Sequence, residues 1–114
     1  MNPTNQLTKP PTAFQRRVFE AVISVPRGKT TTYGALADAV GCGSAQAIGQ
    51  ALRCNPDSPR IPCHRVVRSD GSIGGFFGEN APHAATKKRA LLEAEGVAFD
   101  ALGRVEEAFI LRQL

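Results

Sequence analysis

A cysteine, a histidine and an arginine follow one another in the string Ile61-Pro62-Cys63-His64-Arg65. The thiolate is the nucleophilic form of cysteine, and a histidine and a cation beside the sulfur favour that form. The apolar residues on either side would hold the sulfur at a fixed position. A Cys-His pair also occurs where a small buried cysteine lies next to a histidine that caps a turn, and the dipeptide alone favours that structural interpretation.

The cysteine pattern indicates a reducing compartment. Cys42, Cys54 and Cys63 are odd in number, and no two of them have the spacing of a CxxC pair. The N-terminal sequence MNPTNQLTKPPT lacks the apolar segment of a secretory signal. We therefore expect an intracellular protein, in the cytoplasm or alternatively in a nucleus, without a disulfide framework. With His64 and His83 as the histidines, the spacing of possible ligands also predicts no metal site.

The composition is that of an ordinary globular domain. The 114 residues, at 12.1 kDa, are enough for one domain with a single core. They are 42% hydrophobic and 21% charged, and no apolar run approaches the ~18 residues of a membrane span. These values exclude a membrane protein, a multidomain protein and a wholly disordered chain. The net charge of +4 is compatible with nucleic-acid binding without establishing it.

Four predicted helices position these residues within one domain at 12–114, after a flexible tail at 1–11. The helices run from Thr12 to Val25, from Thr32 to Val40, from Ser44 to Asn55-Pro56, and from Pro82 to Gly96. Thr12 and Ser44 are the expected N-caps. The second and third helices, joined through a glycine-containing turn, form a helix-turn-helix pattern, which is also common in domains that do not bind DNA.

The predicted fold is mainly α with a small β component, a helix-turn-helix, winged-helix-like DNA-binding domain. The fourth helix is expected to turn Leu91 and Leu92 to the core and the run 87–89, which includes Lys88, to solvent. Residues 97–111 are expected to form a terminal hairpin, or a strand and a helix.

Five segments, in this order, resemble the C-terminal domain of the O6-alkylguanine-DNA alkyltransferases. They are GKTTTYGALA, AIGQALRCNP, IPCHRVV, a loop with GGFFG, and LLEAEG. IPCHRV is the specific signal, and the other four are weak alone. The resemblance covers residues 14–97 and implies that the protein removes the alkyl group from O6 of guanine in DNA. It implies no cofactor.

The resemblance also implies the catalytic roles. Cys63 would accept the alkyl group, His64 would take the thiol proton through a water molecule, and Glu95 would orient His64. Tyr33 would donate a proton or hydrogen bond to the departing guanine, and Asn55 would tie the third helix to the Cys63 loop.

Each supporting residue has a structural alternative. Glu95 could be a solvated carboxylate at a helix end, Tyr33 a helix-start residue with an exposed hydroxyl, and Asn55 a helix C-cap. Glu93 is expected to point away from the site.

The resemblance places the third helix in the minor groove of alkylated double-stranded DNA. Small side chains let a helix approach this narrow groove, although they also suit close helix packing. The residues assigned to DNA contact are Ser44, Ala45, Gln46, Ala47, Gly49, Arg53 and Arg65. Arg65 could equally be tied to the core. Arg27, Lys29 and Lys87 are further candidates for phosphate contacts.

The chain departs from the family pattern in three places. Gln46 stands where the family has an arginine that fills the space left by the extruded base, and Phe76 where an aromatic hydroxyl residue is frequent. Only residues 1–11 precede the first predicted helix, whereas most members carry an additional N-terminal domain. The implied substrate pocket consists of Tyr33, Ile61, Val66, Phe76 and Gly78.

Two functions fit these features best. The first is repair of O6-alkylguanine by stoichiometric, irreversible transfer to Cys63, carried out by a monomer. The second is a lesion sensor like the alkyltransferase-like proteins, which bind alkylguanine without repairing it and would engage a repair-protein partner. Those proteins lack the reactive cysteine, so Cys63 favours transfer. A transcription regulator would leave the Cys-His string without a purpose, and a cysteine hydrolase would not explain the small-residue helix.

Overall fold

The computed structural model describes residues 12–54, 60–73 and 82–114, with the side chains of 82–85 excepted. The predicted tail at 1–11 and three predicted site residues, Asn55, Phe76 and Gly78, lie outside the described residues.

The four predicted helices are all present. The α-helices are α2 (Ala13–Ile23), α3 (Tyr33–Val40), α4 (Ala45–Leu52) and α5 (Pro82–Ala94). Two short 3-10 helices are η1 (Cys63–Arg65) and η2 (Glu107–Phe109), and the strands are β1 (Thr30–Thr32), β2 (Val66–Val67) and β3 (Ile110–Leu111). This arrangement confirms the prediction of a mainly α domain with a small β component.

Hydroxyl side chains begin three of the helices. Thr12 and Gln15 form a capping box, in which each side chain bonds the backbone of the other residue. Thr32 accepts a hydrogen bond from the amide of Ala35, and Ser44 accepts one from the amide of Ala47. The predicted N-caps Thr12 and Ser44 are therefore confirmed.

The three strands form one parallel sheet in the order β2-β1-β3. Thr30 and Thr31 of the central strand also donate side-chain hydrogen bonds to the carbonyls of Phe109 and Leu111. The predicted terminal hairpin is reduced to one antiparallel bridge between Phe99 and Val105. The chain then continues through η2 to β3, which pairs with β1.

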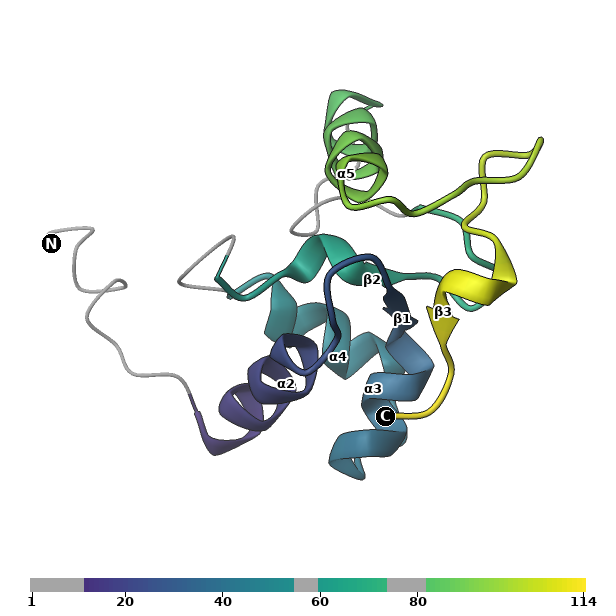
Figure 1. Ribbon diagram of the computed structural model, residues 1–114. Helices are drawn as coiled ribbons and strands as arrows, with labels where there is room; N and C mark the ends of the chain where they lie inside the picture. Colours follow the sequence, from purple (N-terminus) through teal and green to yellow (C-terminus); the bar gives the residue numbers. More distant parts are fainter. Residues whose placement is uncertain (1–11, 55–59, 74–81) are drawn as a thin grey trace, which may run out of the picture.

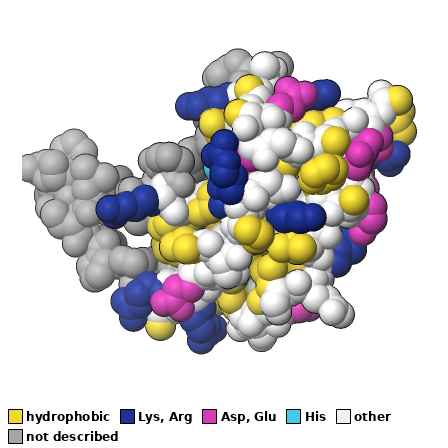
Figure 2. Space-filling model, in the orientation of Figure 1, with side chains coloured by type: hydrophobic (Ala, Val, Ile, Leu, Met, Phe, Trp, Pro, Cys, Tyr) yellow, Lys and Arg dark blue, Asp and Glu magenta, His cyan; other side chains and the backbone are white. Residues whose placement is uncertain are grey.

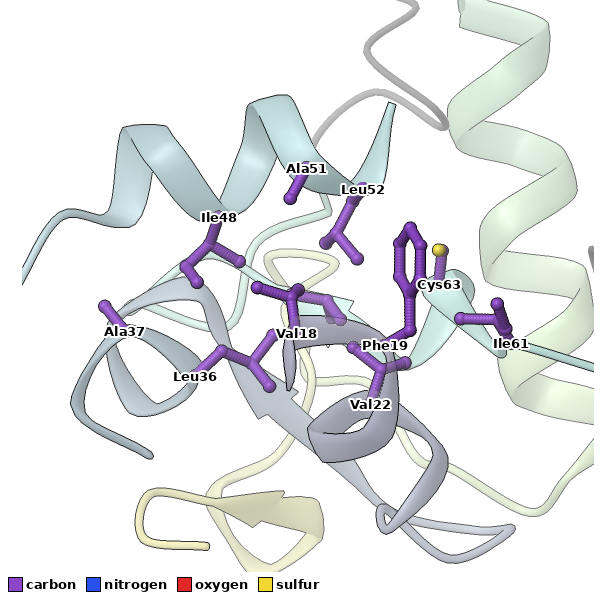
Figure 3. Close-up of a cluster of buried hydrophobic side chains, with 11 residues drawn as sticks. Val18, Phe19, Val22, Leu36, Ala37, Ile48, Ala51, Leu52, Ile61 and Cys63 are labelled. Carbon is purple, nitrogen blue, oxygen red and sulfur yellow. The ribbon is translucent and has the colours of Figure 1, made fainter. Parts of the chain in front are cut away.

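The sheet and η1 lie between two apolar clusters. Helices α2, α3 and α4 enclose the larger one, which includes Cys63, and α5 lies on the opposite side (Figures 1 and 3). The smaller cluster joins Leu92 of α5 to Val67, Val97, Val105 and Ile110. None of the helices in the described ranges is long and apolar enough to cross a membrane.

One prediction for α5 is wrong. Leu92 is buried as expected, but Lys88, which was expected in solvent, is 1% exposed. Lys88 lies one turn before Leu92 and therefore on the same face of the helix, which packs against η1.

Candidate functional site

Cys63 begins the short helix η1 and is 5% exposed. Its side chain belongs to the core cluster, and Figure 3 shows the sulfur beside the ring of Phe19. The amide of Cys63 donates to the carbonyl of Ile61, and that of Arg65 to the carbonyl of Pro62. These two bonds fix the backbone on both sides of the sulfur, and the flanking apolar residues Ile61 and Val66 pack in the same cluster as Cys63.

His64, Arg65 and Glu95 form one hydrogen-bonded network. Nε2 of His64 lies 2.7 Å from Oε2 of Glu95, and Arg65 donates from Nε and Nη2 to both carboxylate oxygens at 2.9 Å. The side chains of His64 and Glu95 are each 6% exposed. The predicted pairing of Glu95 with His64 is thus present, and Glu95 is not a solvated helix-end carboxylate.

The network sets the charges of its members. Burial alone would raise the pKa of Glu95, but hydrogen bonds from Arg65, His64 and the Gly28 amide lower it to about 2. Burial is the main cause that lowers the pKa of His64, and the positive charges of Arg65 and Lys88 lower it further, whereas the hydrogen bond and charge of Glu95 oppose the shift. At neutral pH the pair is therefore a carboxylate and a neutral imidazole. A neutral ring that donates Nε2–H to Glu95 has its lone pair on Nδ1.

The turn before β1 completes the binding site for the Glu95 carboxylate. Gly28 donates its amide to Oε1 of Glu95 at 3.3 Å. Its φ of +88° favours glycine, and a Cβ at this position would lie 3.2 Å from the Glu95 carbonyl oxygen. Glu93, by contrast, is exposed and pairs with Arg89, which confirms that it points away from the site.

Arg65 faces inward. Besides its two bonds to Glu95, it donates from Nη1 to the carbonyl of Val25 at 2.9 Å. Its side chain is 15% exposed. The assignment of Arg65 to DNA contact is therefore not supported, and the alternative in which it is tied to the interior is correct. Arg27 and Lys29 also use their charged groups on backbone carbonyls, those of Ala94 and Ala108.

Tyr33 begins α3 and packs against the cluster that contains Cys63. Burial and the charge of Cys63 raise the pKa of the Tyr33 hydroxyl, and Arg68 opposes this effect. The hydroxyl is therefore protonated at neutral pH and able to donate. Tyr33 does start a helix, as in the structural alternative, but the residue is half-buried against the core cluster.

Lys88 is the residue of the site that the sequence reasoning missed. Burial lowers the pKa of Lys88 to about 8, while the charge of Cys63 favours its protonated form. An ammonium group beside a thiol in turn favours the thiolate. The signal for Lys88 is its spacing from Leu92 and Glu95, since positions i, i+4 and i+7 share one helix face.

Helix α4 turns one face into the core and the other outward. Ile48, Ala51 and Leu52 are buried, whereas Ala45 and Gln46 are exposed. Ala47, Gly49 and the N-cap Ser44 are half-buried, and Arg53 follows the helix as an exposed residue.

The small residues of α4 do not all serve packing. A Cβ added at Gly49 would meet no atom of the described protein within 4 Å. Close packing explains Ala51, which is buried, but leaves Gly49 unexplained. Packing within the described protein therefore does not explain why the side chain at position 49 is so small.

Two other assigned pocket residues, Ile61 and Val66, are buried members of the cluster that contains Cys63. Their contact with a substrate stays a prediction.

The comparison with protein families agrees with this geometry. Residues 13–97 match the family model described as 6-O-methylguanine DNA methyltransferase, DNA binding domain. The chain belongs to this family. A curated relative from Methanothermobacter thermautotrophicus, named methylated-DNA--protein-cysteine methyltransferase, is 46% identical over 78% of this chain and 47% of its own length. The relative of that name from Saccharolobus islandicus is 44% identical over 83% of this chain and 56% of its own length. The chain thus spans about half the length of these relatives.

Solved structures of two kinds resemble the fold. Atl1 of S. pombe, in complex with damaged DNA containing O6-carboxymethylguanine, has a TM-score of 0.70 and 30% identity over 87% of this chain and 94% of its own. OGT of Mycobacterium tuberculosis, in complex with DNA, has a TM-score of 0.66 and 42% identity over 74% of this chain and 50% of its own.

Substitution of Glu95 by glutamine is expected to lower the free energy of unfolding by about 3 kcal/mol, because it leaves the Arg65 cation without its anionic partner. Urea unfolding at neutral pH measures the loss. Glu93→Gln is the matched control, since its exposed pair with Arg89 contributes at most about 0.5 kcal/mol. Equal stabilities of the two variants would contradict the buried network.

The pKa of His64, measured by NMR titration of the imidazole signals, is expected below its ordinary value of 6.5. It should fall further in Glu95→Gln, because the hydrogen bond and negative charge that favour the imidazolium are lost while Arg65 remains. A His83→Gln variant identifies the His64 signals. A rise of the His64 pKa in Glu95→Gln would show that the carboxylate is not what holds the ring.

Proposed function

We propose that the protein repairs O6-alkylguanine in DNA by transferring the alkyl group irreversibly to the sulfur of Cys63. The observation that carries this proposal is a cysteine placed directly before a histidine whose Nε2 is fixed on a buried, arginine-paired carboxylate. The membership of the chain in the methylguanine methyltransferase family supports the choice of substrate.

The reaction begins with removal of the thiol proton. Nδ1 of the neutral His64 ring takes this proton through a water molecule, and Glu95 stabilises the imidazolium that forms. Lys88 stabilises the thiolate by its charge. The sulfur then attacks the alkyl carbon, so that an S–C bond forms and the C–O6 bond breaks. The product is a thioether, which the network has no means to reverse.

The electron pair of the broken bond stays on the guanine. Tyr33 is protonated at neutral pH and packs against the cluster of Cys63, and it donates to a ring nitrogen of the departing base. This donation lowers the cost of the negative charge that develops on the leaving group.

Helix α4 supplies the DNA contact in this proposal. Its exposed first turn and the open space at Gly49 suit entry into the minor groove, which is about 6 Å wide. The target atom is inside the duplex, so the alkylated base must leave the stack to reach Cys63. Gln46, exposed on the first turn, occupies the space left by the base.

A lesion sensor is the competing function. The similarity to S. pombe Atl1, which extends over nearly all of that protein, belongs to the fold. The reactive group distinguishes the two functions, because a sensor has no use for a cysteine with a positioned base.

Incubation with a duplex oligonucleotide that carries one O6-methylguanine is expected to add one methyl group to Cys63, because this sulfur has a base beside it. Intact mass and peptide mapping measure the adduct. Cys54→Ala is the control, since Cys54 is exposed and outside the network; it should transfer like the parent protein, whereas Cys63→Ala should bind the lesion without transfer. Tight binding with an unchanged mass of the parent protein would instead identify a sensor.

Gln46→Arg is expected to raise the affinity for the lesion duplex about threefold to tenfold, because a longer cationic side chain fills the vacated space better. Gln50→Arg, one turn further along α4 and also exposed, adds the same charge. It should raise the affinities for modified and unmodified duplexes alike. Fluorescence anisotropy in the Cys63→Ala background measures both. If the ratio of the affinity for the modified duplex to that for the unmodified duplex is the same in both variants, position 46 does not enter the stack.

A further inference from the structure

The sheet register places Arg68 next to Tyr33. Strands β1 and β2 are parallel neighbours in which Thr32 is paired with Val67. Tyr33 directly follows β1, and Arg68 directly follows β2. The two residues therefore leave adjacent strand ends at the same edge of the sheet.

The backbone at Arg68 is held by a tight turn. Its amide donates to the carbonyl of Ser72 at 3.0 Å, and the amide of Gly71 donates to its carbonyl at 2.8 Å. Asp70 accepts a further bond from the amide of Ser72. Gly71 must remain glycine, since a Cβ there would lie 2.8 Å from the Val105 carbonyl oxygen. Arg68 therefore projects from a fixed base.

The charge of Arg68 acts on the site from the solvent side. The residue is exposed, and its guanidinium lowers the pKa of both Tyr33 and Lys88. The charge of Cys63 also acts on both groups, so the exposed Arg68 lies close to the residues that surround the sulfur.

Four other cations among the described residues are buried or bonded to the protein. Arg65 bonds Glu95 and Val25, Lys88 is buried, and Arg27 and Lys29 bond backbone carbonyls. The lysines and arginines on the face shown in Figure 2 are dispersed rather than gathered into one stripe. A phosphate contact beside Tyr33 would therefore depend on an individual exposed side chain such as Arg68 rather than on a continuous basic surface.

We propose that Arg68 binds the phosphate of the nucleotide whose alkylated base enters the site. A base that leaves the stack remains joined to its sugar and phosphodiester, so an anionic oxygen arrives at the edge of the site with it. A guanidinium suits this group because it can donate two parallel hydrogen bonds to phosphate oxygens. The proposal rests on the proposed function and adds a residue that selects a nucleotide in DNA over the free base.

The test compares two substrates. Arg68→Gln is expected to lower the rate of transfer from a duplex O6-methylguanine oligonucleotide about tenfold. The slope of log binding constant against log salt concentration should become shallower by about one, which corresponds to the loss of one phosphate contact. The rate with free O6-benzylguanine, which has no phosphate, should stay within about twofold. Arg112→Gln removes the same charge from an exposed pair with Glu107 and should change neither rate.

Neutral phosphate analogues locate the contact. Replacing one phosphate beside the lesion by methylphosphonate should slow the parent protein to the level of Arg68→Gln and leave that variant unchanged. An equal fall of both rates in Arg68→Gln would overturn the proposal, because Arg68 would then act through Tyr33 or Lys88. An unchanged rate with DNA would overturn it as well.

A binding measurement separates this proposal from the transfer reaction. In the Cys63→Ala background, Arg68→Gln should weaken binding of the lesion duplex about tenfold, and the methylphosphonate should abolish the difference. If the parent protein transfers nothing from either substrate, the proposed function fails, and this binding result still decides the role of Arg68.

Discussion

The carboxylate of Glu95 is the group on which the geometry of the site depends. It accepts from His64, from two nitrogens of Arg65 and from the amide of Gly28, and so joins the end of α5, η1 and the turn before β1. A buried charge is tolerated only when it is paired and hydrogen-bonded. Each hydrogen-bond partner of Glu95 lies in another segment of the chain, so each bond also joins two segments. The same interaction that orients the imidazole therefore fixes the relative positions of three segments.

Burial and function are coupled at the reactive sulfur. Cys63 belongs to the larger apolar cluster, which α2, α3 and α4 enclose, yet it also interacts with the ammonium of Lys88 on α5. The core supplies the fixed position and a low dielectric, and the cation supplies the charge that favours a thiolate. Arg68 extends this positive field to the surface.

Local signals were readable from the sequence, and long-range ones were not. Thr12 and Ser44 act within three residues, so their capping roles follow from the sequence itself. The link from Glu95 to His64 came from the family pattern. Lys88 was misplaced because lysine is rarely buried, and the charge that accompanies its burial comes from Cys63, which is distant in the sequence.

The sheet was the other part that sequence reasoning could not reach. Thr30 to Thr32 has no alternation of apolar and polar residues, and its partners lie at Val66 and at Ile110. The two roles open for Arg65 could be separated only once the position of Glu95 was known.

The pairing of β1 with β3 has a consequence for synthesis on the ribosome. Thr30 and Thr31 take their partners from residues 109–111, about eighty positions later in the chain. The strand that leads into Tyr33 is therefore completed only after those late residues have emerged from the exit tunnel. A nascent polypeptide that already contains α3 and α4 still lacks the pairing of β1 with β3, so the final placement of Tyr33 waits for residues made about eighty positions later.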